Sequence, residues 1–177
     1  VSLIMKKLLG ILIVGFFLCS TSFAEDISEL EIEGISIGDS LLDHLSKQEI
    51  ITEIEINKIA YNYLTDDFGE VYLFGNFDIY ERLSFFVKPK DKSYSIYFIK
   101  GSVSYDDKVE QCYAKQKEIA KEFSLLYKNV TKREGTLKFD FDPTGKSTTH
   151  NIKFVFDSGD YIAVNCTKYE KNLKIKH

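Results

Sequence analysis

The sequence has few arginines, the residue whose planar guanidinium binds phosphate in a bidentate way. Its only arginines are Arg82 and Arg133, so this form of anion recognition has few candidates. Acidic residues outnumber basic ones, 27 to 23, and the formal net charge is −4 at pH 7. A nucleic-acid binder needs a clustered basic face to contact phosphates. We therefore expect no nucleic-acid partner.

Histidine and cysteine are also scarce, with three residues of each. His44, His150 and His177 are scattered, and none lies at a metal-ligand spacing from another histidine or from a cysteine. The pattern predicts no zinc site or other metal centre, and no motif indicates a cofactor.

Proline, internal repeats and low-complexity linkers are nearly absent. Pro89 and Pro143 are the only prolines, and no repeat or linker is visible between them or around them. A chain of this length can bury enough surface for one core without metal ions to hold it together. We expect a single domain that spans residues 25–177.

The one long apolar run lies within residues 1–24 and is typical of a secretory signal peptide. A basic pair after Met5 precedes an apolar core at residues 8–18, and small residues occupy positions minus three and minus one of a cleavage site at Ala24. We predict export, cleavage after Ala24 and a periplasmic mature protein.

Two other interpretations of this segment stay open. An uncleaved membrane anchor needs about 20 apolar residues, whereas this run is interrupted from Cys19 to Ser22. A lipoprotein signal would acylate Cys19, but such signals carry a small residue before the cysteine, and Leu18 is bulky. We favour cleavage, which leaves no stable transmembrane anchor.

Alternation of apolar and polar residues predicts antiparallel hairpins. Two apolar trios surround a turn at residues 88–92: Leu83, Phe85 and Val87 before it, and Tyr94, Ile96 and Phe98 after it. Two further hairpin-like steps follow, starting with a strand at residues 137–141 and ending at residue 169. Strands joined by such short turns must be antiparallel.

Two helices are expected between and before these hairpins. Residues 109–126 carry apolar side chains at spacings of three and four, which predicts a helix about 30 Å long with one apolar face. A shorter helix should follow Ser46, whose spacing to Glu49 fits a capping box. Residues 27–37 are expected to form an opening strand with a bend at Gly34. The predicted class is α+β: a single domain in which an antiparallel β-sheet of about five to seven strands packs on one long helix, with a shorter N-terminal helix.

Cys112 and Cys166 are the cysteines that remain after signal cleavage. Cys112 lies in the apolar stripe of the long predicted helix, and Cys166 lies on the apolar side of the last predicted strand. These two faces should pack together, and an exported protein meets an oxidising compartment. The pattern predicts a Cys112–Cys166 disulfide. Two free buried thiols, or a catalytic or metal-binding role, are the alternatives; a catalytic thiolate needs an electropositive setting and a histidine.

The segment Gly38-Asp39-Ser40-Leu41 resembles the first block of the GDSL hydrolases, which are secreted esterases and lipases. The resemblance implies that Ser40 is a nucleophile, deprotonated by a histidine that an aspartate orients. The family's Gly-x-Asn-Asp and Asp-x-x-His blocks have no match, and tight antiparallel hairpins do not fit the family's parallel sheet. The competing interpretation is that Ser40 caps a helix.

Two other segments resemble catalytic motifs over a few residues. GKST at residues 145–148 is similar to the end of a phosphate-binding loop, but Asp140 stands where the first glycine should be. DFDPT at residues 140–144 is similar to the nucleophile motif of haloacid-dehalogenase-like phosphatases, which opens a large α/β domain, whereas 33 residues follow it here. We interpret both as a hairpin loop, with a weak, partly hydrated cation site as the alternative.

Two segments, IEGISIGDSLLDHLSKQEI and CYAKQKEIAKEF, together with the predicted signal resemble small exported proteins of Gram-negative bacteria that carry no assigned function. The resemblance implies a location and not an activity.

A non-catalytic binding or interaction module is the favoured function. Phe86, Tyr97 and Ile99 alternate away from the predicted core face, and a run of exposed apolar side chains usually marks a contact surface. The partner would be an envelope protein or a small ligand. Two alternatives stay open: the aromatic segment at residues 61–77 covers this surface, or the chain is a hydrolase that uses Ser40 or acids such as Asp39 and Asp43.

Overall fold

The computed structural model of the chain describes residue 27, residues 30–60 and residues 67–171. The predicted signal peptide at residues 1–24, with its cleavage site at Ala24, lies outside the described residues, so its presence and its cleavage stay predictions. Among the helices that are described, none is both long and apolar enough to cross a membrane.

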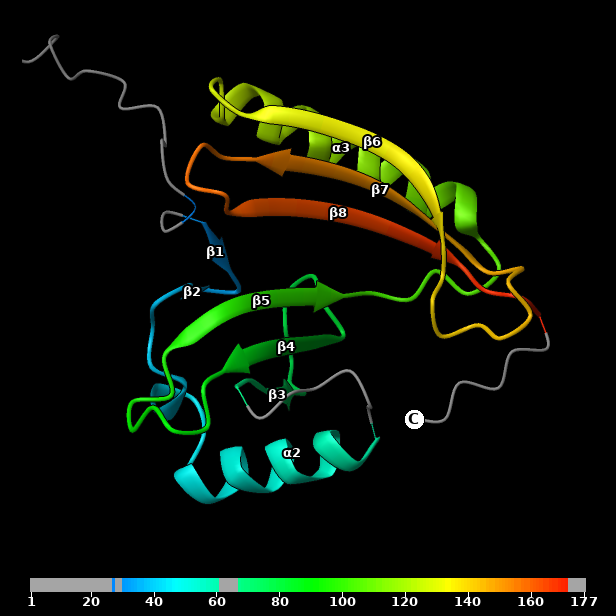
Figure 1. The fold of residues 1–177 in the computed structure, drawn as a ribbon. Coiled ribbons are helices and arrows are strands. Elements are labelled where there is room, and N and C mark those ends of the chain that lie inside the picture. The colour runs from blue at the N-terminus through cyan, green and yellow to red at the C-terminus, as the bar shows by residue number, and fades with distance from the viewer. Residues whose placement is uncertain (1–26, 28–29, 61–66, 172–177) are drawn as a thin grey trace, which may run out of the picture.

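The described chain forms two units, and each is a helix followed by three antiparallel strands (Figure 1). The first unit consists of α2 (Lys47–Ala60), β3 (Gly69–Leu73), β4 (Arg82–Val87) and β5 (Ile96–Ser102). The second consists of α3 (Val109–Leu126), β6 (Thr131–Lys138), β7 (Thr148–Val155) and β8 (Tyr161–Lys168). The strand orders β3-β4-β5 and β6-β7-β8 make each sheet a simple meander. A small hairpin, β1 (Glu31–Ile32) and β2 (Ile35–Ser36), precedes both units.

This architecture confirms the mixed α+β class and corrects the predicted arrangement of strands. The prediction of five to seven strands on one long helix is wrong, because the described residues form three small antiparallel sheets. The long helix α3 separates β5 from β6 along the chain, and each three-stranded sheet closes its apolar face with the helix that precedes it. This repeated order of elements leaves no visible repeat in the sequence, because the two helices differ in length and in apolar spacing. α2 has 14 residues and α3 has 18.

The core of the first unit lies between α2 and one face of its sheet. Leu83, Phe85 and Val87 are fully buried on that face, as their alternation predicts. Ile50 of α2 and Leu41 of the preceding 3-10 turn pack against them. Burial of one such side chain contributes about 1.5–3 kcal/mol, so this face fixes the position of α2.

The segment before α2 is a tight hairpin, not the predicted strand with a bend. Glu33 and Gly34 form its turn with positive φ values of 54° and 76°. The Glu33 carboxylate accepts hydrogen bonds from the backbone N–H groups of Ile79, Asp78 and Tyr80, and these bonds, that of Ile79 first, lower its pKa. The hairpin is thereby tied to the loop that leads into β4.

α2 begins at the predicted capping box. The Ser46 hydroxyl accepts from the Glu49 N–H at 3.3 Å, and the Glu49 carboxylate accepts from the Ser46 N–H at 2.8 Å. These contacts with Ser46 lower the pKa of Glu49. The reciprocal pair satisfies two backbone donors that the start of a helix leaves without partners.

Two polar side chains of α2 form hydrogen bonds with backbone groups of β3, the edge strand beside it. Asn57 Nδ2 donates to the Glu70 carbonyl at 2.8 Å, and the Glu53 carboxylate accepts from the Tyr72 N–H at 3.3 Å. Edge strands present unpaired backbone groups that invite pairing with other chains. α2 therefore closes the β3 edge of the first unit.

The second unit has a separate core between α3 and two of its three strands. Ile152, Phe154 and Ile162 are buried in it together with Ala120 of α3. β6 stays outside this core, and all eight of its residues are exposed. The predicted strand at residues 137–141 is therefore misplaced: β6 ends at Lys138, and Leu137 and Phe141 are exposed.

We predict that Gly69 is required for the close approach of α2 to β3. A Cβ at this position would lie 2.6 Å from Cγ1 and 2.8 Å from Cγ2 of Ile54. Both atoms are bonded directly to the Ile54 Cβ, so neither can swing away alone. Gly69→Ala should lower the free energy of unfolding by about 1–3 kcal/mol through overpacking, as measured by urea denaturation.

Gly135→Ala in β6 is the matched control, because nothing lies within 4 Å of a Cβ there. Its effect should stay within about 0.5 kcal/mol. Equal stabilities for the two variants would contradict the packing of α2 against Gly69.

Candidate functional site

The face of the first sheet that is turned away from α2 carries a row of polar side chains. Tyr72, Ser84 and Lys100 stand directly opposite one another on β3, β4 and β5. Glu70 and Arg82 lie two residues from Tyr72 and from Ser84 respectively, so they share that face. These five residues are termed the Ser84 cluster.

Ser84 is the centre of the cluster and is only 1% exposed. Its hydroxyl oxygen is buried and has no hydrogen-bond partner among the residues that the structure describes. A buried polar group left unpaired destabilises a protein by about 1–3 kcal/mol, and such groups are rare enough to need an explanation. A ligand that hydrogen-bonds to this hydroxyl would be one.

Arg82 and Lys100 place two positive charges around Ser84. The Arg82 guanidinium carbon lies 4.6 Å from the centroid of the Tyr72 ring, a cation–π geometry that holds it over the sheet. Lys100 reaches solvent, yet its pKa is lowered, first because nearby protein atoms displace part of its hydration. Attraction by Glu70 opposes this lowering, and repulsion by Arg82 adds to it.

The other end of the same face is aromatic. Phe86 stands opposite Phe98, and their rings meet edge to face with centroids 5.3 Å apart. Phe68 and Tyr97 make a similar contact at 5.7 Å, and Lys88 Nζ lies 4.4 Å from the Tyr97 ring centroid. The face therefore offers an apolar region next to a cationic one.

The structure divides the three residues of the predicted binding surface. Phe86 and Tyr97 belong to the aromatic end, where Tyr97 is 46% exposed and Phe86 is half-buried. Ile99 stands opposite Phe85 and packs against the core of the first unit. An irregularity in pairing, which places Val87 opposite Ile96 and Phe86 opposite Phe98, inserts Tyr97 as an extra residue and reverses the alternation around it.

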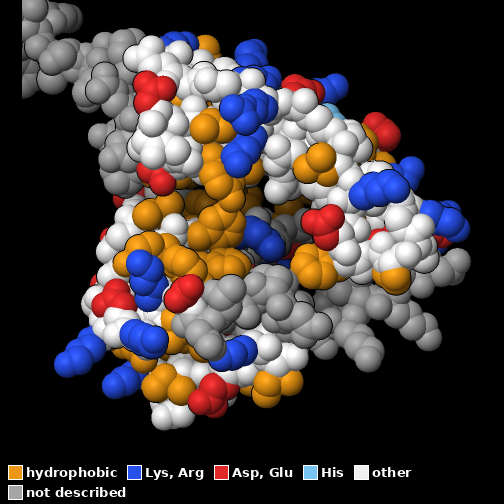
Figure 2. Space-filling model, viewed as in Figure 1, with side chains coloured by type: hydrophobic (Ala, Val, Ile, Leu, Met, Phe, Trp, Pro, Cys, Tyr) orange, Lys and Arg blue, Asp and Glu red, His pale blue; other side chains and the backbone are white. Residues whose placement is uncertain are grey.

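The second unit contributes a residue near the cationic end. Burial raises the pKa of Tyr169, and the positive charge of Arg82 partly offsets that rise, so the two side chains lie within electrostatic reach. Tyr169 contacts Phe139 edge to face, with centroids 5.2 Å apart. Figure 2 shows a hollow between the two units, with hydrophobic side chains gathered along it and Lys or Arg side chains at its rim.

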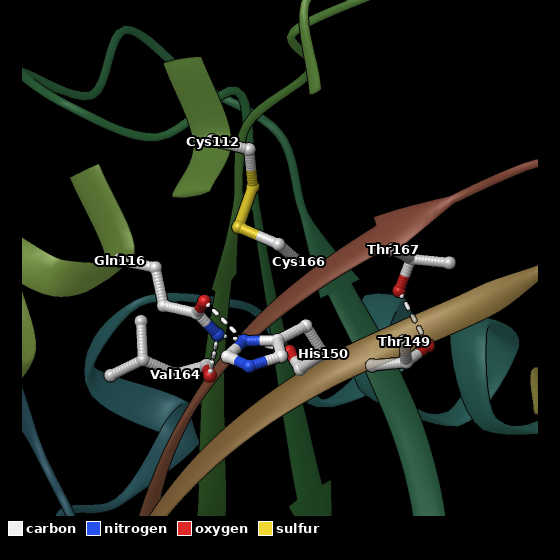
Figure 3. The surroundings of a disulfide bond; sticks show 7 residues. All are labelled: Cys112, Gln116, Thr149, His150, Val164, Cys166 and Thr167. Atoms are coloured by element: carbon white, nitrogen blue, oxygen red, sulfur yellow. Dashed lines mark hydrogen bonds between the residues drawn. A yellow bond between two sulfur atoms is a disulfide. The ribbon is translucent and has the colours of Figure 1, made fainter. Parts of the chain in front are cut away.

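The predicted disulfide is present and joins α3 to β8 (Figure 3). Cys112 and Cys166 are bonded, and their Cα atoms are 5.9 Å apart. One turn further along α3, Gln116 Nε2 donates to the carbonyls of His150 and Val164 at 2.9 and 2.6 Å. Because its amide nitrogen serves these carbonyls, Gln116 Oε1 accepts from His150 Nδ1 at 2.7 Å. With both sulfurs bonded to each other, neither cysteine is a free thiol or thiolate.

Replacing both cysteines by alanine should destabilise the protein strongly. The disulfide closes a loop between residues 54 apart, and loss of such a cross-link is worth about 4 kcal/mol in the chain-entropy model. Urea unfolding of the variant and of the oxidised parent measures the difference. Titration of the unreduced mature protein with an alkylating reagent should find no reactive thiol, and two equivalents would show that the cross-link is absent.

The hydrolase candidate Ser40 occupies the capping position of a 3-10 turn, Leu41–Asp43. Its hydroxyl accepts from the Leu42 N–H at 3.3 Å and donates to the Ser93 carbonyl at 2.7 Å. Asp39 accepts from the Ser36 N–H at 2.8 Å. These contacts are those of a helix cap that joins the N-terminal segment to the β4–β5 turn.

The two motif-like segments around residues 140–148 form one loop organised by Asp142. This side chain is 5% exposed and accepts from the N–H groups of Thr144, Lys146 and Ser147 and from the Thr144 hydroxyl. Hydrogen bonds from Ser147, and then from Thr144, hold the pKa of Asp142 well below its ordinary value of 3.8. Its oxygens are thus occupied by the loop itself.

We expect Asp142→Asn to destabilise the protein in a pH-dependent way. Because the folded pKa lies below the unfolded one, the carboxylate contributes stability that is fully present above about pH 5 and is lost as the pH falls through 3.8 and below. The melting temperature of the variant should therefore fall below that of the parent at pH 7, and the gap should narrow toward pH 3. Asp140→Asn, an exposed neighbour in the same loop, is the control; a gap that is independent of pH would contradict this role for Asp142.

The chain matches no protein-family model, no curated protein and no solved structure. Within the described residues, no three histidine, cysteine or acidic side chains lie close enough together to hold a metal ion. The Ser84 cluster was not predicted from the sequence, because a lone serine at an alternating position is typical of a solvated sheet face. Arg82, one of two arginines in the chain, is the signal that could have directed attention to it.

Proposed function

We propose that the protein is an exported, non-catalytic binding module that takes an anionic group at the Ser84 cluster. The observation that carries the proposal is the buried Ser84 hydroxyl, which lacks a partner among the described residues. Ser84 lies opposite Lys100 and two residues from Arg82 on the same face of the sheet. A carboxylate or phosphate oxygen would accept from this hydroxyl. Hydrogen bonds to charged groups contribute about 1.5–3 kcal/mol, more than those between neutral groups.

The electrostatics of the cluster favour an anion over a neutral ligand. Arg82 and Lys100 are two basic residues on this face, against one acidic residue, Glu70. Nearby protein atoms lower the pKa of Lys100 by displacing part of its hydration, and a bound anion would favour its charged form. The Arg82 guanidinium can also bind two oxygens of one carboxylate or phosphate at once.

The aromatic end gives the ligand a second property. Phe86 and Phe98 lie next to Ser84 and Lys100 along β4 and β5, so an anionic group in the cluster would carry its remaining atoms over these rings. A ligand with an anionic head and an apolar body fits both ends. Anionic amphiphiles are abundant in a bacterial envelope, which agrees with the predicted periplasmic location.

The disulfide supports the export part of the proposal. Disulfides form and persist in oxidising compartments and are rare in the cytosol, and Cys112–Cys166 is a structural cross-link between two elements of the second core. The capping contacts of Ser40 support the non-catalytic part, because its hydroxyl is already engaged by two backbone groups.

Ser84→Ala should change stability and binding in opposite directions. Removing an unpaired buried hydroxyl should raise the free energy of unfolding by about 1 kcal/mol. Removing a donor to the bound anion should weaken binding of 1-anilinonaphthalene-8-sulfonate, an aromatic anion, by about tenfold or more. Urea denaturation and dye fluorescence measure the two effects. A variant that is less stable and binds equally well would refute the proposed role.

Two sets of controls, one of ligands and one of variants, distinguish the contribution of the ligand's charge from that of its apolar body. Decanoate should displace the dye, whereas decanol and decyltrimethylammonium should not. Arg82→Gln/Lys100→Gln should abolish displacement by decanoate, whereas Lys90→Gln/Lys92→Gln, which removes the same charge from the exposed β4–β5 turn, should leave it unchanged. Equal displacement by decanol would point to a site that is merely apolar.

A further inference from the structure

β6 is a long edge strand that no described element covers. Among the strands that the structure describes, it pairs with β7 alone, over eight consecutive residues, and all eight are exposed. Half of the backbone N–H and C=O groups of such a strand point away from the sheet, where an added strand can pair with them. Edge strands in natural proteins are usually kept short, interrupted by a bulge or covered by another element. β3 of the first unit, for example, is covered by α2.

The position of α3 explains why β6 is left uncovered. Cys112 is bonded to Cys166 on β8, and Gln116 bonds to carbonyls of both β7 and β8. These contacts hold the helix over two strands of the three. Beside the helix, a groove of about 390 Å³ runs along β6, with the buried Ala120 and Ile152 at its base.

The rim of this groove is positively charged. Lys117 and Lys121 of α3 and Lys132 of β6 line it together with one acid, Glu134. Glu134 lies 3.7 Å from Lys132 and 3.5 Å from His150 Nε2, so its charge is shared with these neighbours. Within the described part of the chain, neither Lys117 nor Lys121 has an ion-pair partner. Two cations therefore stand uncompensated on an otherwise acidic protein.

The charges on β6 disfavour a second copy of this chain as the occupant. β6 carries three basic residues, Lys132, Arg133 and Lys138, and one acid, Glu134, so pairing of two copies would bring together strands of like net charge. Like charges directly opposite each other destabilise a strand pair, and lysines on an edge are a common protection against self-association. The same lysines attract an acidic strand.

We propose that β6 and the groove beside it dock an extended acidic segment of a partner protein, which adds to the sheet as a fourth strand. Backbone hydrogen bonds to β6 supply affinity, and alternate side chains of the added strand meet the lysine rim and supply specificity. This surface shares no residue with the Ser84 cluster, so the inference is independent of the proposed anion-binding function.

The test uses the mature, disulfide-bonded protein and a fluorescein-labelled peptide of nine residues that alternates glutamate with valine. The peptide should bind at least tenfold more tightly than one that alternates lysine with valine, as measured by fluorescence polarisation, and its affinity should fall as salt is raised. Hydrogen–deuterium exchange should show new protection within residues 131–138, at about half of the β6 amides.

Charge-reversal variants assign the binding to the groove. Lys117→Glu/Lys121→Glu should weaken binding of the acidic peptide at least tenfold, whereas Lys90→Glu/Lys92→Glu, with the same change in net charge on the β4–β5 turn, should leave it unchanged. Equal affinity for both peptides, no loss in the groove variant, or unchanged exchange in β6 would each overturn the proposal. Concentration-dependent dimerisation that protects β6 without peptide would assign the edge to a second copy, which also overturns it.

Discussion

The placement of α3 over β7 and β8 determines most of what the second unit exposes. A covalent bond from Cys112 and two hydrogen bonds from Gln116 occur one helical turn apart and both lead to the last two strands. With the helix held there, its apolar residues meet Ile152, Phe154 and Ile162, and β6 has no helix above it. The exposed edge and the groove beside it agree with this position of the helix and with the polar sequence of β6.

The two units share an order of elements and differ in which backbone groups their helices occupy. In the first unit, Asn57 and Glu53 reach the outer edge of β3. In the second, Gln116 reaches carbonyls of the middle strand, β7, and of the far edge strand, β8. Both units therefore have the same topology, a helix followed by a three-stranded meander. In the first unit the helix covers the edge strand that follows it, β3, whereas in the second unit the edge strand that follows the helix, β6, is left exposed. The first unit has its own departure from regular packing on the polar face around Ser84. There the buried Ser84 hydroxyl has no hydrogen-bond partner among the described residues.

The parts of the structure governed by local rules could be predicted from the sequence. Alternation identified the buried face of β4, the spacing of Ser46 and Glu49 identified the start of α2, and the apolar settings of Cys112 and Cys166 identified the disulfide. Each rests on a period or a spacing within one element, or on two apolar faces that must meet.

The parts that depend on pairing between distant segments could not be predicted. Strand alternation carries no information on which strands share a sheet, so the division into separate sheets was missed. The extra residue at Tyr97 moved Ile99 to the core side, because one inserted residue reverses every later side chain. β6 was misplaced because a strand exposed on both faces has no apolar period. The Ser84 cluster was missed because it arises only when three strands bring their polar residues together.

Both cysteines outside the predicted signal lie in the second unit, one on its helix and one on its final strand. The first unit contains none, so its core assembles through contacts that are indifferent to redox conditions. In the second unit, in contrast, the disulfide ties the first element, α3, to the last, β8. A reducing agent would therefore remove a cross-link from the second unit alone.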